Sequence, residues 1–193
     1  MKNDNTNQLF ALIGVTASGK TELAKHLCKK HGFFYIPSIT TRPPRGDNET
    51  DYKHVTAEEF ERYIKNSELL EYTHFAGNYY GKLKKDVEEH LEKGHSVYTI
   101  TFDRVKELKG LINHVKIICI HPNDPIPETV GKRLKDRGHH EEEISRRIKT
   151  VYDELKLIDG LKEDGFIDYH ITTKEDDYNH AIEEINKIAE KHK

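Results

Sequence analysis

The sequence predicts an α/β fold in which helices cover both faces of a mostly parallel β-sheet. Two observations support this prediction. Short apolar runs alternate with segments of helical periodicity over most of the chain, as parallel strands and their crossover helices require. In addition, the first apolar run, Leu9–Val15, is followed by a glycine-rich loop and then by a helical pattern. A strand, a turn and a helix in that order form the first half of a βαβ unit.

The elements of the first half follow from local patterns. Leu9–Val15 is an uninterrupted apolar run, as a strand buried on both faces requires, and a helix is expected from about Lys20 to His31. The stretch HGFFYI then predicts a turn and a second strand. Thr56 begins another helix, because it can cap the helix and Glu59 stands where a capping box needs it. The following helix carries one apolar stripe, made of Leu83, Val87 and Leu91.

The second half continues this alternation. Buried strands are expected at His95–Phe102, His114–Ile120 and Phe166–Thr172. The charged segment Arg137–Glu143 is expected to be an exposed turn. The region from Ser38 to about Lys85 interrupts the rhythm and is expected to form an inserted lobe. Two amphipathic helices are indicated, one by Ile144, Ile148, Val151, Leu155 and Ile158, and the last by Tyr178, Ala181, Ile182, Ile185 and Ile188.

Size, charge and cysteine content limit the classes of protein to which this chain can belong. The chain has 193 residues, enough for one domain, and its formal net charge of −3 argues against nucleic acid as a partner. Cys28 and Cys119 lie far apart in apolar surroundings, so we expect buried, reduced thiols in a cytoplasmic protein. No apolar run approaches the roughly 20 residues of a membrane span, and the polar N-terminus lacks the apolar core of a signal peptide.

The loop after the first strand, GVTASGKT from Gly14 to Thr21, matches the phosphate-binding pattern G-x-x-x-x-G-K-[ST]. Its glycines let backbone amides wrap a polyphosphate, and the N-terminus of the next helix attracts negative charge. We expect Lys20 to neutralise the outer phosphates and the Thr21 hydroxyl to hold Mg²⁺. The pattern predicts binding of a nucleoside triphosphate and leaves open a kinase, a GTPase or an ATPase motor. The loop residues that would bind the nucleotide, which is ATP if the chain is a kinase, are Gly14, Thr16, Ala17, Ser18, Gly19, Lys20 and Thr21.

A second basic feature is the segment SITTRPPRGDNETDY, from Ser38 to Tyr52. Arg42 and Arg45 flank two prolines in it, and an arginine fork matches the geometry of a phosphate monoester. The prolines stiffen the segment, so less conformational entropy is lost on binding. A kinase must hold a second anionic substrate in line with the donor, and this segment suits that role. Taken alone, it is equally well explained as a solvated basic loop.

Four stretches make the chain resemble the guanylate kinases: SITTRPPR, DYKHVTAEEFERYI, LLEYTHFAGNYYG and the later RLKDRG…EEEISRRI. Their order and spacing fit that family over nearly the whole chain. The resemblance implies a P-loop kinase fold and the phosphorylation of GMP or dGMP by ATP with Mg²⁺. It also implies three parts, which are a core of about residues 1–37, 86–124 and 159–193, a nucleoside-monophosphate (NMP)-binding lobe of about 38–85 and a helical lid of about 125–158.

The resemblance also implies roles for single residues. Glu71 matches the carboxylate that recognises guanine, which suits a base whose N1–H and N2 amino groups are adjacent donors. Arg133, Arg137 and Arg147 match lid arginines that reach the ATP phosphates, and Lys20, Arg137 and Arg147 are expected to be catalytic. Arg146 is the alternative to Arg147, because the spacing from Arg137 is one residue short. The grip on the GMP phosphate corresponds to Ser38, Arg42, Arg45, Tyr52 and Tyr80.

Three positions depart from the family pattern. Where the family has a small hydroxyl residue near guanine O6, the chain has Lys82, which is expected either to donate to O6 or to turn out to solvent. The family's acids at the end of the strand at 95–102 are replaced by Thr99 and Thr101, with Asp103 as a substitute. In the last strand, the stretch YHITTKED lacks the family's asparagine near the adenine end.

These departures keep two other functions open. One is a related kinase that acts on another nucleoside monophosphate or on a ribose bisphosphate, and the other is a non-catalytic guanylate-kinase-like binding module. A metal site at His139–His140 is disfavoured, because the spacing is not that of a zinc motif. The expected partners are the small molecules ATP and GMP or dGMP, with neither nucleic acid nor a membrane, and the expected state is a monomer or a homodimer.

Overall fold

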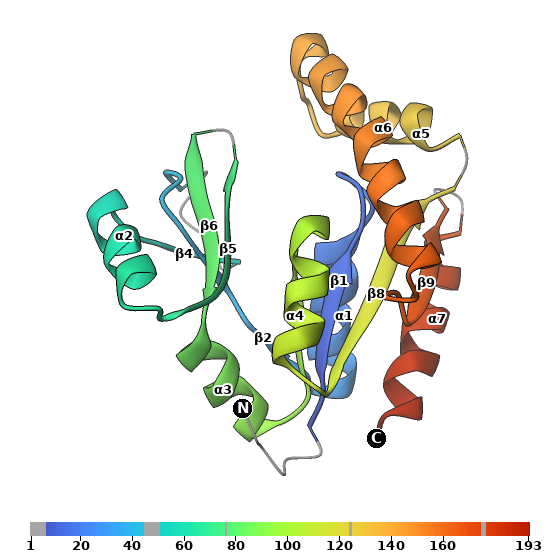
Figure 1. Ribbon diagram of the computed structural model, residues 1–193. Coiled ribbons are helices and arrows are strands. Elements are labelled where there is room, and N and C mark those ends of the chain that lie inside the picture. Colours follow the sequence, from blue (N-terminus) through green and yellow to red (C-terminus); the bar gives the residue numbers. More distant parts are fainter. Residues whose placement is uncertain (1–6, 45–50, 76, 124, 175–176) are drawn as a thin grey trace.

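The computed structural model describes residues 7–44, 51–75, 77–123, 125–174 and 177–193, which form two β-sheets with helices around them (Figure 1). The first sheet has five strands in the order β2-β7-β1-β8-β9, and neighbouring strands in it are parallel. The predicted parallel sheet is therefore confirmed. The strand bounds are β1 (Leu9–Ile13), β2 (Phe34–Tyr35), β7 (Ser96–Thr99), β8 (Val115–Pro122) and β9 (Tyr169–Thr173).

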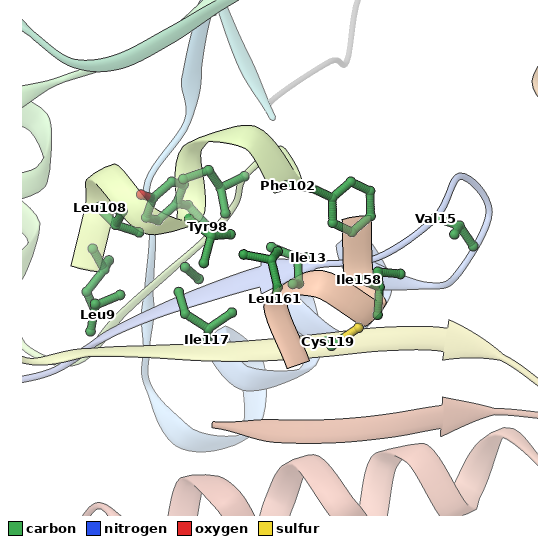
Figure 2. Close-up of a cluster of buried hydrophobic side chains, with 14 of the residues drawn as sticks. Leu9, Ile13, Val15, Tyr98, Phe102, Leu108, Ile117, Cys119, Ile158 and Leu161 are labelled. Atoms are coloured by element: carbon green, nitrogen blue, oxygen red, sulfur yellow. The ribbon is translucent and has the colours of Figure 1, made fainter. Parts of the chain in front are cut away.

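Helices cover both faces of this sheet, which explains why its central strand is apolar throughout. Every residue of β1 is buried, and its side chains alternate between two apolar clusters. Leu9 and Ile13 pack with α4 (Val105–Leu111) and the C-terminal half of α6 (Glu141–Glu163), as Figure 2 shows. Phe10 and Leu12 pack on the opposite face with α1 (Lys20–His31) and α7 (Tyr178–Lys191). The sheet is thus a rigid, doubly covered platform for the loop that follows β1.

The chain between residues 38 and 85 forms the second sheet, where the sequence pattern predicted a break in rhythm. Its order is β4-β3-β6-β5, and β6 is antiparallel to both of its neighbours. Phe60 of α2 packs on this sheet, and Thr56 caps that helix as predicted, accepting a hydrogen bond from the Glu59 N–H at 3.1 Å. The elements are β3 (Ser38–Thr40), β4 (Tyr52–His54), α2 (Ala57–Lys65), β5 (Leu69–Phe75), β6 (Asn78–Leu83) and α3 (Lys84–Lys93).

A pair of helices, α5 (Ile126–Asp136) and α6, connects β8 with β9. Val130 and Leu134 of α5 are buried against Ile144 of α6, so the two helices share one apolar seam. The exposed turn predicted at Arg137–Glu143 is too long, because α6 begins at Glu141. Its first turn holds three glutamates, whose negative charge stabilises a helix N-terminus.

Other boundaries also differ from the sequence prediction. The strand predicted at His95–Phe102 ends at Thr99, and Phe102 belongs to the short 3₁₀ helix η1 (Phe102–Arg104). Leu83 precedes α3 and is not part of it. Both thiols are free as expected, but only Cys119 is buried, whereas Cys28 is partly exposed. Over the described ranges, none of the helices has both the length and the apolarity needed to cross a bilayer.

Candidate functional site

The loop between β1 and α1 is held in a wrapped conformation by its glycines. Gly14 has φ 152°, and a Cβ there would lie 1.9 Å from the backbone oxygen of Ile120 in β8. Gly19 adopts a left-handed conformation with φ 94° directly before α1. These positions need glycine because any side chain would clash or strain the turn. The backbone amides at the start of α1 therefore border a pocket of about 420 Å³, which is lined by Ala17, Ser18, Gly19, Lys20, Thr21, Glu22, Lys25, Asp51 and Arg137.

Lys20 folds back over this loop. Its Nζ donates hydrogen bonds to the backbone oxygens of Gly14 at 2.7 Å and Val15 at 2.8 Å, and lies 3.3 Å from Ser18 Oγ. Burial lowers the pKa of Lys20 to about 8, while the negative charge of Glu154 in α6 opposes this shift. The ammonium is thus kept at the inner edge of the pocket, where an anion can be neutralised.

Thr21 is the residue in this pocket with a hydroxyl suited to Mg²⁺. It is half-buried in the first turn of α1 and borders the pocket beside Lys20. Within the described ranges, no group of three or more His, Cys, Asp and Glu residues could hold a metal ion. Mg²⁺ commonly binds through few protein ligands and the phosphates of its substrate, so the donor set fits that ion. His139, considered as a metal ligand from sequence, instead donates from Nδ1 to Glu143.

Arg133 of α5 links the phosphate loop to strand β9 through hydrogen bonds. Its guanidinium donates to the backbone oxygen of Ala17 at 3.1 Å, and to Oγ1 and the backbone oxygen of Thr173 in β9 at 2.9 and 2.8 Å. The buried Thr173 hydroxyl in turn donates to the Ser18 backbone oxygen at 3.0 Å. Arg133 therefore contacts loop carbonyl groups, and Thr173 is a site residue that the sequence pattern did not single out.

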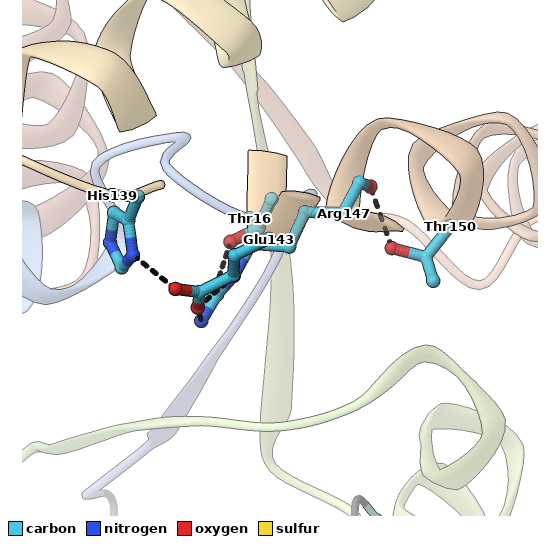
Figure 3. Close-up of polar contacts among 5 residues, drawn as sticks. All are labelled: Thr16, His139, Glu143, Arg147 and Thr150. Atoms are coloured by element: carbon cyan, nitrogen blue, oxygen red, sulfur yellow. Dashed lines mark hydrogen bonds and ion pairs between the residues drawn. The ribbon is translucent and has the colours of Figure 1, made fainter. Parts of the chain in front are cut away.

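Arg147 of α6 reaches the same loop from the other side (Figure 3). Its Nη1 donates to Oγ1 of Thr16 at 3.1 Å, and its other edge is held by Glu143. Arg146 is exposed to solvent, so of the two neighbouring arginines only Arg147 contacts the loop. Arg137 is exposed at the end of α5 and borders the pocket next to Lys20. The structure thus brings Arg133, Arg137 and Arg147 to the rim of one loop.

Arg42, Tyr52 and Tyr80 gather on the second sheet. The Arg42 guanidinium lies 5.2 Å from the centre of the Tyr52 ring, and the Tyr52 and Tyr80 rings are 6.0 Å apart. Ser38 begins β3 and pairs in register with Tyr52 of β4. Arg45, predicted to share this cluster, lies outside the described residues. The arrangement places a cation just after β3 and two phenol groups on β4 and β6, the strands on either side of β3.

Glu71 and Lys82 face each other across β5 and β6. They are register partners and are 8% and 0% exposed, so both charged groups are buried. Lys82 Nζ donates to the backbone oxygen of Ile36 at 2.6 Å and lies 4.7 Å from the centre of the Tyr98 ring. Burial raises the pKa of Glu71 and lowers the pKa of Lys82, and the attraction between their charges opposes both shifts. The alternative that Lys82 turns out to solvent is therefore wrong.

Asp103, which the sequence suggested as a substitute for the family's strand-end acids, is not buried in the site. Asp103 is exposed in η1, where it pairs with Nε of Arg104 at 3.2 Å. Asp86 of α3 is buried and accepts a hydrogen bond from Lys53 at 2.8 Å. Glu154 is another acid that sequence reasoning missed, and it interacts with Lys20 while burial raises the pKa of its carboxyl group. A single acid on a long amphipathic helix carries no signal that would mark it as a site residue.

Comparisons with known proteins agree with this geometry. The guanylate kinase family model matches residues 6–192. A guanylate kinase of Fusobacterium nucleatum is 37% identical, over 77% of this chain and 81% of that protein, and one of Clostridium tetani is 32% identical over 93% and 84%. The crystal structure of guanylate kinase from Anaplasma phagocytophilum superposes with a TM-score of 0.68 at 25% identity, covering 96% of this chain and 86% of that one. The chain therefore belongs to the guanylate kinase family.

Proposed function

We propose that this protein transfers the γ-phosphoryl group of ATP to GMP or dGMP, giving ADP and GDP or dGDP. The observation that carries this proposal is the pairing of a phosphate loop on the first sheet with a buried carboxylate, Glu71, on the second. The relatives named above are all guanylate kinases. The two sheets supply one binding surface for each substrate.

The donor side consists of the loop, Lys20 and the arginines on α5 and α6. We propose that the loop amides and Lys20 hold the β- and γ-phosphates of ATP, with Arg137 and Arg147 meeting the group in transfer. When bound, Mg²⁺ would neutralise charge on the phosphate oxygens, and Thr21 is the residue that would hold it. Phosphoryl transfer depends mainly on positioning and charge neutralisation, which these groups supply.

The acceptor side is the second sheet. We assign the GMP phosphate to Arg42, Tyr52, Tyr80, Ser38 and Arg45. The Glu71 carboxylate would accept hydrogen bonds from guanine N1–H and N2, a pattern that adenine cannot match because its N1 carries no hydrogen.

Lys82 would complete this recognition at guanine O6. An ammonium has three donors, and the Ile36 oxygen takes one of them. In the described part of the chain, Nζ makes no second hydrogen bond, so two buried donors are left, and a ligand oxygen could take one of them.

We further propose that the chain works as the three parts expected from its sequence. The core would be about residues 1–37, 86–124 and 159–193, the NMP-binding lobe about 38–85 and the lid about 125–158. The strands of the second sheet lie within the residues proposed for the lobe, and α5 and the N-terminal part of α6 lie within those proposed for the lid, while α6 continues to Glu163. Closure of the lid over both substrates would exclude water from the transfer. A monomer or homodimer in the cytoplasm, without nucleic acid or a membrane as partner, completes the proposal.

A coupled ADP-release assay tests this function. ATP and Mg²⁺ are supplied with GMP, dGMP, AMP, CMP, UMP or ribose 1,5-bisphosphate, and turnover is expected with GMP and dGMP. Lys20→Ala should abolish turnover with the fold intact, whereas Lys30→Ala, an exposed lysine on the same helix, should not. Preference for another acceptor would favour a related kinase, and turnover with none would favour a binding module.

A further inference from the structure

The Arg147 guanidinium is held by two residues, Glu143 of its own helix and Thr16 of the phosphate loop (Figure 3). Its Nε and Nη2 donate to Oε1 of Glu143 at 3.0 and 2.8 Å, and its Nη1 donates to Oγ1 of Thr16 at 3.1 Å. The second oxygen of Glu143, Oε2, accepts a hydrogen bond from Nδ1 of His139 at 2.9 Å. The hydrogen bonds from His139 and from Arg147 lower the pKa of Glu143 to about 2, so this carboxylate is ionised at neutral pH.

The Glu143 carboxylate binds one particular edge of the Arg147 guanidinium. A guanidinium is planar, and its edges cannot rotate independently. Glu143 occupies the edge formed by Nε and Nη2, which leaves the Nη1 edge directed at the phosphate loop. A free arginine side chain samples many rotamers, whereas this one is fixed at both ends of its guanidinium. Glu143 thus orients the group without covering the edge that faces the loop.

We propose that Glu143 is a positioning residue for phosphoryl transfer. It holds Arg147 so that the Nη1 edge meets the phosphoryl group in flight, and His139 keeps the carboxylate in place through its second oxygen. This inference rests on the proposed function, in which Arg147 contacts that group. Glu143 itself touches neither substrate.

A surface ion pair within one helix would behave differently. Such pairs at i and i+4 contribute only a few tenths of a kcal/mol to helix stability and affect no distant group. Here the arginine also bonds Thr16, which lies on a different element. The two readings therefore differ in what they predict for catalysis.

The test measures turnover in five variants, of which two carry Arg147→Met. Glu143→Ala should lower kcat about tenfold while leaving KM for GMP within about twofold, because only the orientation of Arg147 is lost. Glu143→Gln should recover part of the loss, since its amide oxygen still accepts from Arg147. Glu142→Ala, an exposed acid on the same turn, is the control and should match the wild type. In an Arg147→Met background, Glu143→Ala should cause no further loss.

Two results would overturn the inference. One is a kcat for Glu143→Ala equal to that of the Glu142→Ala control, and the other is an equal loss with and without Arg147. Wild-type protein without turnover on any acceptor would refute the proposed function instead. The NMR signal of the Arg147 Nε–H then still tests the contact, because it should be sharp in the wild type and broadened in Glu143→Ala. An unchanged signal would overturn the positioning role independently of activity.

Discussion

Replacing Lys82 by methionine removes a buried charge while keeping the shape of the side chain. The ammonium is fully buried, donates to the Ile36 oxygen at 2.6 Å and faces Glu71 across the strands. Other charges also act on it, with Asp86 and Asp51 attracting it and Lys53 repelling it, but the interaction with Glu71 is the largest. The main effect of Lys82→Met should therefore be a change in the ionisation of Glu71.

The size of that effect follows from the geometry of facing strands. Opposite side chains stand ~5 Å apart, and at an effective dielectric constant of about 20 two unit charges at that distance attract by about 3 kcal/mol. Losing this attraction shifts the ionisation equilibrium of Glu71 by about a hundredfold toward the protonated form. Because burial already raises the pKa of Glu71, the variant should hold it largely protonated at neutral pH. A protonated carboxyl group cannot accept from both guanine donors.

The assay is kcat/KM for GMP as a function of pH. At pH 7 we expect kcat/KM of Lys82→Met to fall by several hundredfold to about a thousandfold, because a nearly hundredfold loss of ionised Glu71 multiplies a roughly tenfold loss of binding. The deficit should shrink to about tenfold at high pH as Glu71 ionises. The remaining loss reflects the missing donor to guanine O6. Lys85→Met, which removes an exposed lysine of α3, is the matched control. A pH profile of Lys82→Met that overlies the wild type would refute this reasoning.

Three further predictions concern the phosphate loop. Because burial lowers the pKa of Lys20 to about 8, affinity for ATP should fall as the pH rises through 8 and Lys20 loses its charge, and equal dissociation constants at about pH 7 and pH 9 would contradict this. Arg133→Met removes the bonds to Ala17 and Thr173, so the free energy of unfolding in urea should fall by about 2–4 kcal/mol, and an unchanged midpoint would argue against the network. In Gly14→Ala the new Cβ would meet the Ile120 oxygen at 1.9 Å, so ATP binding by calorimetry should weaken at least about a hundredfold, whereas Gly110→Ala, with open space around it, should bind normally.

The fold was predictable because its signals are local. A strand covered on both faces must be apolar at every position, and Leu9–Ile13 showed that pattern without knowledge of its neighbours. Thr56 predicted the start of α2 because Glu59, the residue whose N–H it caps, lies only three positions further along the chain. The phosphate loop was predictable for the same reason, since its glycines and Lys20 are adjacent in the chain.

The contacts that complete the site were not predictable, because they join residues remote in sequence. Thr173 donates a hydrogen bond to the loop residue Ser18, which is 155 positions away in the sequence. Lys82 donates one to the backbone oxygen of Ile36, which is 46 positions away. No periodicity links such pairs, and their geometry exists only after the sheets have packed. The start of α6 was misplaced for a different reason, since charged residues suit both a solvated turn and the first turn of a helix.

The buried lysine also couples the effects of substitutions at positions 71 and 82. An isolated ammonium without a nearby carboxylate would be strongly destabilising at a fully buried position, so Lys82 depends on Glu71. Loss of the acid alone would leave Lys82 with less compensation for its burial, so Glu71→Gln should destabilise the fold more than replacement of both Glu71 and Lys82 by neutral residues. The cost of replacing either residue therefore depends on whether its partner is still present.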